Sequence, residues 1–271
     1  DLIMKICLIR PPAVVPIGAY IGSLTPPIGL AYLAGSLKQQ GFETVIIDAV
    51  GMGIEKTTPF GSQLLKYGLD FEEILDLIPN DCDLIGLSGM FSSEWNALKP
   101  LYETITDRFE DKFVVAGGEH FTAAPDLSMK YLPKLDAIVM GEGEETITEL
   151  ASALAKGSDL KDVHGLVLND KSGIIKTPAR RRVRAIDSIA WPNWENIPVE
   201  EYLSRGHSYG VNRGRSMPMI ASRGCPYQCT FCSNPQMWGT RWVARDVNDL
   251  VDEIEFYIKK YSITNVDFYD L

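Results

Sequence analysis

The sequence has little of what marks several common classes of protein. Among 271 residues there are five cysteines and three histidines, and 26 Lys and Arg face 36 Asp and Glu, a net charge of −10. This acidity disfavours nucleic acid as a partner, because a phosphate backbone is bound mainly through positive charge. No run approaches the roughly 18 apolar residues of a membrane span, and the first residues lack the pattern of a signal peptide. An odd number of cysteines, most of them clustered, is not typical of a disulfide framework. We therefore predict that the protein resides in a reducing cytoplasm.

Short apolar runs alternate with helical patterns over the first 160 residues. The runs lie at 5–12, 44–51, 82–89, 113–120 and 136–143, and each is typical of a strand buried on both faces. Helical patterns stand between and after them, at 26–41, 71–79, 97–109, 126–132 and 145–157. This alternation predicts an α/β fold with a doubly wound parallel sheet covered by helices.

The ends of the predicted strands carry the residues expected of a ligand site, because doubly wound sheets bind ligands beyond the carboxyl ends of their strands. The candidates are Arg10, Pro11, Ser88, Gly89, Met90, Gly117, Gly118, Glu119, Gly141, Glu142 and Gly143. Paired glycines let a ligand lie close to the backbone. Any single end has a structural explanation, since glycine also ends strands tightly and acid complements a helix dipole. No GxGxxG or Walker sequence follows a strand, so we expect a large, flat ligand that is not polyanionic.

The rest of the chain predicts a linker followed by the start of a β/α barrel. Residues 164–178 have a hairpin pattern, 185–203 form a linker rich in Trp and Pro, and 205–217 form a loop. A short strand then precedes three cysteines, followed by a helix capped by Asp246 and a strand at 265–271. The helix should bury one apolar face, made of Val247, Leu250, Val251, Ile254, Ile258 and Tyr261. We predict a doubly wound domain at 1–160, a hairpin and linker at 161–214 and the start of a barrel at 215–271. The one basic run, at 180–184, is interpreted as a solvated face.

Cys225, Cys229 and Cys232 provide three thiolates inside eight residues. A structural zinc site requires four ligands, and the nearest histidine is His207, in the polar loop. Cys7 and Cys82 lie in predicted strands and are interpreted as small core residues. Three cysteines suit a 4Fe–4S cluster that leaves one iron open to another molecule.

These segments resemble a known family. The loop CPYQCTFC resembles the CxxxCxxC loop of the radical S-adenosylmethionine (radical SAM) superfamily. The tracts TPPIGLAYLAGSLKQQGFETVIIDA, GGEHFTAAPD and GEGEETITEL resemble the cobalamin-binding, Rossmann-like domain that precedes the barrel in one large subgroup. The resemblance runs from about Lys5 to Leu271.

The resemblance implies cofactors and partners. The three cysteines would hold a 4Fe–4S cluster whose open iron chelates S-adenosylmethionine, which is cleaved to a 5′-deoxyadenosyl radical under anaerobic conditions. Phe231 would pack near the adenine, Asp270 would contact the methionyl amino group, and cobalamin would lie on the strand ends. A low-potential electron donor such as ferredoxin or flavodoxin and a small-molecule or lipid substrate are also implied. Unlike some cobalamin domains, the segment after the first strand has no histidine, so cobalt would lack an imidazole from there; His120 is a conceivable substitute.

Several functions are consistent with this pattern. The first hypothesis is a cobalamin-dependent methyltransferase that acts on an unactivated carbon, and the alternative within the family is a cyclase or rearrangement enzyme. A methylthiotransferase is disfavoured because Cys7 and Cys82 cannot form a second cysteine triplet. From another class, a non-catalytic iron–sulfur, zinc or corrin-binding sensor module is possible. A barrel needs more strand–helix units than follow the cysteines, so we expect the natural protein to continue beyond Leu271.

Overall fold

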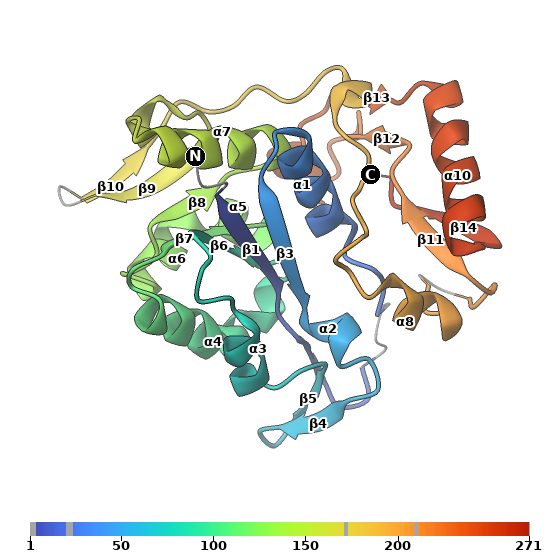
Figure 1. The fold of residues 1–271 in the computed structure, drawn as a ribbon, viewed down its shortest axis with the longest axis horizontal. Coiled ribbons are helices and arrows are strands. Elements are labelled where there is room, and N and C mark those ends of the chain that lie inside the picture. The colour runs from blue at the N-terminus through green and yellow to red at the C-terminus, as the bar shows by residue number, and fades with distance from the viewer. Residues whose placement is uncertain (1–3, 20–23, 171–172, 209–210, 271) are drawn as a thin grey trace.

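A twisted, mostly parallel sheet forms the centre of the molecule (Figure 1). The structure is a computed structural model that describes residues 4–19, 24–170, 173–208 and 211–270. Within this part of the chain, seven strands are paired in the order β10-β9-β8-β7-β6-β1-β3. The parallel strands are β1 (Lys5–Arg10), β3 (Glu43–Asp48), β6 (Leu84–Ser88), β7 (Phe113–Gly117) and β8 (Ala137–Val139). These are the five predicted strands, and the doubly wound α/β fold is confirmed.

The predicted hairpin extends this sheet. Its strands are β9 (Leu166–Asp170) and β10 (Gly173–Lys176), and β9 pairs antiparallel with β8. The tip of the hairpin at 171–172 lies outside the described residues.

Helices cover both faces of the sheet, because its strands are apolar on both sides. One face carries α1 (Ile28–Gln39) and α7 (Glu144–Lys156). The other carries α3 (Phe71–Leu77), α4 (Trp95–Arg108), α5 (Glu119–Ala123) and α6 (Pro125–Tyr131). The short α2 (Ala49–Met52) continues directly from β3. The predicted helices are therefore all present, with boundaries shifted by a few residues.

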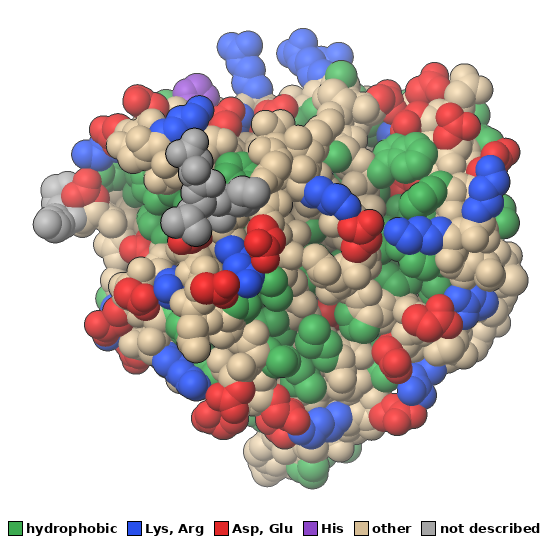
Figure 2. Space-filling view, in the orientation of Figure 1, with side chains coloured by type: hydrophobic (Ala, Val, Ile, Leu, Met, Phe, Trp, Pro, Cys, Tyr) green, Lys and Arg blue, Asp and Glu red, His purple; other side chains and the backbone are tan. Residues whose placement is uncertain are grey.

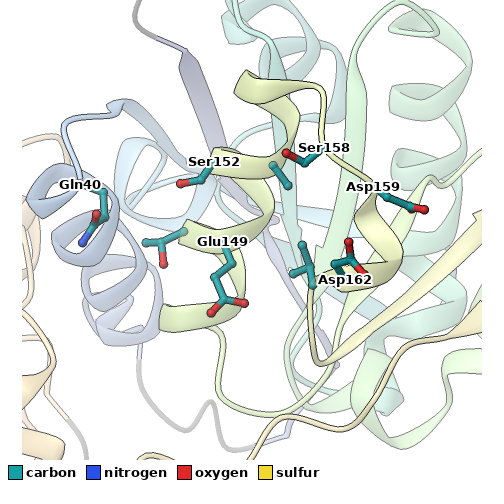
Figure 3. Close-up of a pocket in the computed structure, with 9 residues that line it drawn as sticks. Gln40, Glu149, Ser152, Ser158, Asp159 and Asp162 are labelled. Atoms are coloured by element: carbon teal, nitrogen blue, oxygen red, sulfur yellow. The ribbon is translucent and has the colours of Figure 1, made fainter.

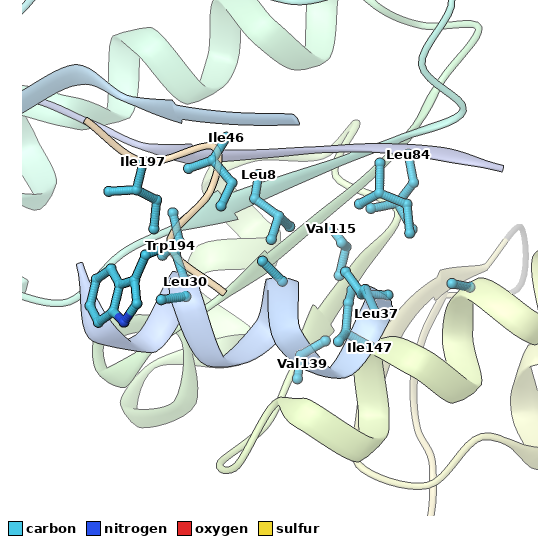
Figure 4. Close-up of a cluster of buried hydrophobic side chains, with 14 of the residues drawn as sticks. Leu8, Leu30, Leu37, Ile46, Leu84, Val115, Val139, Ile147, Trp194 and Ile197 are labelled. Carbon is cyan, nitrogen blue, oxygen red and sulfur yellow. The ribbon is translucent and has the colours of Figure 1, made fainter. Parts of the chain in front are cut away.

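Helix α1 is buried on its outer side as well. The backbone N–H of Asn193, in the linker, donates a hydrogen bond to the carbonyl oxygen of Ala31 at 2.8 Å. A Cβ added at Gly35 would lie 2.2 Å from the carbonyl oxygen of Trp191, so only glycine permits this approach. Figure 4 shows side chains of α1, the sheet and the linker residues Trp194 and Ile197 in a single cluster. The linker therefore belongs to the core of the α/β domain.

The C-terminal segment forms the strand, loop, helix and strand predicted for the start of a barrel. Strand β11 (Ser216–Met219) pairs in parallel with β14 (Asn265–Phe268), and α10 (Val247–Tyr261) connects the two. Between β11 and α10, β12 (Ser222–Arg223) pairs with β13 (Val243–Ala244), and α9 (Asn234–Met237) follows the cysteines. The linker contains α8 (Val199–Ser204). This segment shares its apolar core with the α1 face of the sheet.

The predicted buried face of α10 is partly wrong. Val247, Val251 and Ile258 are 71%, 45% and 51% exposed, whereas Glu253 and Tyr257 are buried. The helix is turned so that the Tyr257 hydroxyl accepts a hydrogen bond from Trp194 Nε1 at 2.9 Å and donates one to Glu253 at 2.5 Å. Glu253 is in turn paired with Arg245 at 2.5 Å. A buried polar network therefore fixes the orientation of α10. The predicted cap is confirmed, since the Asp246 carboxylate accepts two backbone N–H bonds of the first turn.

A second, small sheet was not predicted. Strands β2 (Ala13–Pro16), β5 (Leu64–Tyr67) and β4 (Thr57–Phe60) pair antiparallel below the carboxyl end of β1 in Figure 1. Each has four residues, and two of them contain proline, so neither length nor alternation marks them as strands.

No helix in the described part of the chain combines the length and apolar character required to span a membrane. Acidic and basic side chains are interspersed over the face shown in Figure 2.

Candidate functional site

The carboxyl ends of the parallel strands meet at one edge, as predicted. Arg10 of β1 lies opposite Asp48 of β3, and Ser88 of β6 lies opposite Gly117 of β7. The order of the strands reverses between β1 and β6, which is the position where doubly wound sheets bind ligands. The candidate site is therefore this edge, together with whatever the C-terminal segment places against it.

Arg10 belongs to a buried network rather than to an open surface. Its guanidinium donates to the Thr25 carbonyl oxygen at 2.8 Å and to the Tyr202 hydroxyl oxygen at 2.9 Å, and lies 3.3 Å from the Asp48 carboxylate. The Tyr202 hydroxyl donates to Asp48 at 2.6 Å. Burial, and then the charge of Asp48, raise the pKa of Tyr202, so its hydroxyl stays protonated. This network ties α8 to the ends of β1 and β3. Pro11, beside it, is buried.

The glycines at the ends of β6 and β7 hold two backbone segments in contact. The Gly89 N–H donates to the Gly117 carbonyl oxygen at 2.9 Å, and the Gly89 carbonyl oxygen accepts from the His120 N–H at 3.1 Å. A Cβ added at Gly118, where φ is +105°, would lie 2.6 Å from the Gly89 carbonyl oxygen. The close approach of these two segments is therefore a structural reason for glycine at these positions. Met90, beside Gly89, is 47% exposed.

His120 is packed into the domain beside this edge. Its ring stacks on Trp95 with centroids 4.5 Å apart, and Nδ1 is 2.9 Å from Ser92 Oγ. Burial lowers the pKa of His120, so the neutral ring is favoured. Its Nε2 atom is buried and has no hydrogen-bond partner among the described residues. The imidazole is thus held by its surroundings.

The acidic segment at the end of β8 binds the stem of the cysteine loop. Arg223 of β12 donates to Glu142 at 3.1 Å and to Glu144 at 2.5 Å, and all three side chains are at most 9% exposed. The Arg223 guanidinium also lies 5.3 Å from the centre of the Tyr32 ring, on α1. Glu142 accepts a further hydrogen bond from the Val183 N–H at 3.0 Å. We refer to Arg223, Glu142 and Glu144 as the carboxylate clamp.

A second contact brings the cysteine loop to the same edge. Trp238, directly after α9, donates from Nε1 to Glu119 at 3.4 Å, and α9 packs against α5. Gly141 and Gly143 flank the clamp, and Gly141 is exposed, with its N–H bonded to Thr122 Oγ1 at 3.0 Å. The loop that follows β12 therefore lies over the ends of β7 and β8. Sequence reasoning missed Arg223, Glu144 and Trp238, although an arginine two residues before the first clustered cysteine was a signal that could have been used.

The three clustered cysteines are free thiols at the surface. Cys229 and Cys232 are exposed and Cys225 is partly exposed, whereas Cys7 and Cys82 are buried core residues, as predicted. Burial raises the pKa of Cys7 and of Cys82, which makes them poor thiolate ligands. Among the described residues, no three Cys, His, Asp or Glu side chains are close enough to hold a metal ion. The three clustered cysteines are thus free thiols that belong to one loop.

Two other predicted residues lie near this loop. Phe231 is 92% exposed, and Tyr227 is 71% exposed. Asp270, after β14, accepts hydrogen bonds from the backbone N–H groups of Ala221 at 2.7 Å and Ser222 at 3.0 Å, both through Oδ1. Asp270 thus supports the turn that leads from β11 to β12.

A cavity of about 390 Å³ lies away from this edge (Figure 3). It is lined by the C-terminal half of α7, by Gln40 after α1 and by the segment 158–163. Helices antiparallel to the strands place their C-termini at the amino ends of the strands, so this cavity is at the opposite end of the sheet from the cysteines.

Comparison with known proteins identifies the N-terminal part. Residues 14–151, about half of the chain, match the family described as the B12 binding domain. The chain belongs to the B12-binding domain family. The match runs from Val14 in β2 into α7 and includes the candidate residues at the ends of β6, β7 and β8, whereas β1 with Arg10 precedes it.

Relatives that match most of the chain extend beyond the B12-binding domain. An uncharacterized methyltransferase of Pyrococcus horikoshii is 32% identical over 269 residues, covering 99% of this chain and 53% of the relative. An anaerobic magnesium-protoporphyrin IX monomethyl ester cyclase of Rubrivivax gelatinosus is 31% identical over 251 residues, covering 91% of this chain and 41% of the relative. The chain spans about half the length of the curated relatives it matches.

A solved structure matches the fold of nearly the whole chain. The cobalamin-dependent S-adenosylmethionine radical enzyme OxsB, with aqua-cobalamin and S-adenosylmethionine bound, aligns with 99% of this chain and 34% of that chain, with a TM-score of 0.74 and 21% identity. The predicted resemblance to radical SAM enzymes with an N-terminal cobalamin-binding domain is confirmed.

Proposed function

We propose that this chain holds the cobalamin and the cluster of a radical SAM methyltransferase, which methylates an unactivated carbon of a small-molecule or lipid substrate. The observation that carries the proposal is the contact between the cysteine loop and the carboxyl edge of the B12-binding domain. The carboxylate clamp and the Trp238–Glu119 hydrogen bond join the cysteine loop to the ends of β7 and β8, which supports neighbouring sites for the two cofactors. Methyl transfer between two cofactors requires such proximity. The methyltransferase named among the relatives also supports it.

The residues present fit the cofactors. Cys225, Cys229 and Cys232 are unpaired soft ligands in one exposed loop, and three of them leave one iron of a 4Fe–4S cluster open. The corrin would lie at the carboxyl ends of β6 and β7, beside Gly89, Gly117 and Gly118, where doubly wound sheets bind ligands. When bound, the cluster with S-adenosylmethionine supplies a 5′-deoxyadenosyl radical, and cobalamin supplies the methyl group.

The protein residues would position these groups and exclude water. The carboxylate clamp fixes β12 to the end of β8, which sets the position of Cys225 relative to the corrin edge. Asp270 holds the turn before β12 through Oδ1, so a contact with the methionyl amino group would use Oδ2. Phe231 would cover the adenine, which would account for an aromatic side chain held 92% exposed on this loop.

We also propose that no histidine of this chain would coordinate the cobalt of a bound cobalamin. His120 is buried and stacked, and its Nδ1 is engaged with Ser92, so its ring would have to leave Trp95 to reach a ligand. The expected electron donor is a ferredoxin or flavodoxin, and the expected location is the cytoplasm.

A cyclase is the second candidate function. Its support is the cyclase of Rubrivivax gelatinosus, whose identity to this chain is within one percentage point of that of the methyltransferase. The products discriminate, because methylation consumes one S-adenosylmethionine as methyl donor and leaves S-adenosylhomocysteine, whereas cyclisation leaves none.

Anaerobic reconstitution tests the proposal. The chain should bind about four irons per molecule, and Cys225→Ala, Cys229→Ala or Cys232→Ala should each abolish the cluster. Cys7→Ala and Cys82→Ala are the matched controls and should retain it. Cob(II)alamin added to the chain should bind, and its EPR spectrum should show no nitrogen superhyperfine splitting from a protein imidazole; a splitting that vanishes in His120→Ala would contradict this. Stoichiometric zinc without iron would refute the proposal in favour of a zinc module, and loss of iron in Cys82→Ala would show that the ligands are misassigned.

A further inference from the structure

The basic run at 180–184 contributes to a cavity beside the cysteine loop. This cavity of about 330 Å³ is lined by four arginines and two valines: Arg181, Arg182, Arg184, Arg241, Val183 and Val243. Such a concentration of positive charge is unusual in a chain with a net charge of −10. In Figure 2, basic side chains project from the upper edge of the molecule, where Figure 1 shows the segment after β10 crossing towards β12 and β13. We refer to this cavity as the arginine pocket.

Most of the charge of the arginine pocket has no counter-charge in the described part of the protein, since Arg182 alone is paired, with Glu142 at 3.5 Å. The neighbouring Arg180 is only 13% exposed and is paired with Glu145 and Glu149 on α7. By contrast, the side chains of Arg181, Arg184 and Arg241 make no ion pair or hydrogen bond with any part of the chain that the structure describes. The interpretation of the basic run as a solvated face therefore holds for Arg181 and Arg184, which are exposed, and not for Arg180. It does not account for the convergence of these two with Arg241 on one cavity.

Arg182 provides the second observation. Its Nε and Nη2 atoms are buried and have no hydrogen-bond partner among the described residues, and the carboxylate of Glu142 is 3.5 Å from Nη2. The guanidinium is held in place by Trp238, whose ring centre is 5.6 Å away, and by a hydrogen bond from Nη1 to the Arg241 carbonyl oxygen at 3.4 Å. Buried donors without acceptors are unfavourable, and the charge of this guanidinium adds to that of the three exposed arginines.

The pocket adjoins the residue before the first clustered cysteine. Val243 is the register partner of Arg223, and a Cβ added at Gly224 would lie 2.2 Å from the Arg241 carbonyl oxygen and 2.9 Å from Arg182 Nη1. The arginines therefore stand against the backbone that leads directly into Cys225.

We propose that the arginine pocket binds the phosphate or pyrophosphate group of a small molecule. Guanidinium groups are suited to this chemistry, because their planar donors match phosphate oxygens and several of them can share one polyanion. An acidic protein surface fits less well, since the arginines line a cavity of only about 330 Å³, which suits a compact group. The site stands independently of the proposed methyl transfer.

Calorimetric titration of the metal-free chain with inorganic pyrophosphate tests the proposal. Arg181→Gln, Arg184→Gln and Arg241→Gln should each weaken binding by about tenfold, the loss expected for one charge-assisted contact. Because these side chains are exposed and unpartnered, the variants should fold normally, which circular dichroism would verify. Arg213→Gln is the matched control: it removes an exposed arginine whose side chain likewise has no partner in the described structure, and it should change affinity by less than about twofold.

Further arms separate the sources of the phosphate. Vesicles of phosphatidylcholine with phosphatidic acid, compared with phosphatidylcholine alone, report a lipid phosphate. Binding to these vesicles that is lost in Arg241→Gln would support the site with a lipid ligand, and pyrophosphate binding alone would support a soluble one. The proposal is wrong if pyrophosphate and both vesicles fail to bind, if Arg213→Gln weakens binding as much as the pocket variants, or if S-adenosylmethionine or an acidic flavodoxin displaces pyrophosphate competitively.

Discussion

Replacing Arg223 by methionine should destabilise the chain and loosen the cysteine loop at once. Arg223 is two residues before Cys225 and is the buried cation that neutralises Glu142 and Glu144. Methionine retains much of the aliphatic length over Tyr32 but removes the charge. Two carboxylates would then be left at the end of β8 with less compensation than before.

The size of the effect follows from what each carboxylate retains. Breaking a buried ion pair by removing one partner typically costs about 3–5 kcal/mol. Glu142 keeps the Val183 N–H at 3.0 Å and Arg182 at 3.5 Å, whereas Glu144 loses the one side-chain cation described beside its carboxylate. One carboxylate is thus stranded rather than two, so we expect a loss near the lower end, about 3 kcal/mol. That is a large share of the roughly 5–15 kcal/mol by which domains are usually stable.

Urea unfolding of the metal-free chain measures this loss. Arg223→Met should lower the unfolding midpoint clearly, and adding Glu144→Gln to it should recover part of the loss, because the stranded charge is then removed. Arg205→Met is the control, since Arg205 pairs with Glu55 and Glu201 at the surface, and its midpoint should remain close to that of the wild type. The carboxylate clamp does not stabilise the contact between the domain and the loop if Arg223→Met has the same urea midpoint as the wild type. The same conclusion follows if the double variant is no more stable than the single one.

Two further predictions concern the strand edge. Burial lowers the pKa of His120 below its ordinary value of 6.5, so the unfolded chain takes up a proton that the folded chain resists, and stability should fall as the pH drops below about 6.5. His120→Phe, which keeps an aromatic ring on Trp95, should show a smaller fall between urea midpoints measured at about pH 7.5 and about pH 5.5, and an unchanged fall would assign the dependence to other groups. Gly118→Ala should cost about 1–3 kcal/mol, because φ is +105° and the Gly89 carbonyl oxygen is in the way, whereas Gly117→Ala, whose Cβ would meet only Val139 at 3.7 Å, should cost little; equal midpoints for the two would refute the strain argument.

The sequence predicted the parallel strands, their shared edge and the order of the C-terminal elements, because these follow from runs of apolar residues and from turn residues. It did not predict what the polar side chains at the edge contact. Arg10 and Glu142 were proposed for the corrin, and the structure engages both in ion pairs with residues distant in sequence, Asp48 and Arg223. Periodicity also failed for α10, where Tyr257 and Glu253 are buried in place of Val247 and Ile258. The contacts of a polar side chain depend on tertiary structure and leave no periodic signal.

The assignments of individual residues to cofactors stay predictions. This holds for the cluster cysteines, for Phe231 and Asp270, and for the glycines and Glu119 at the strand ends. The divisions at 160 and 214 are likewise still predictions, and the shared apolar core argues for testing them by limited proteolysis rather than assuming independent folding.

The outer side of α1 has a consequence for how the protein is made. The contacts that cover it, at Ala31, Tyr32 and Gly35, come from Asn193, Arg223 and Trp191, which are translated long after the helix and its strands. At ordinary rates of synthesis the helix would wait on the order of ten seconds for these partners, with one side unfinished at the ribosome. A nascent chain in this state is a natural client for chaperones that bind apolar helices. A chimaera that joined this B12-binding domain to a foreign barrel would leave the outer side of α1 exposed. Residues 191–203 and β12, which contains Arg223, would have to be transferred with the domain to cover it.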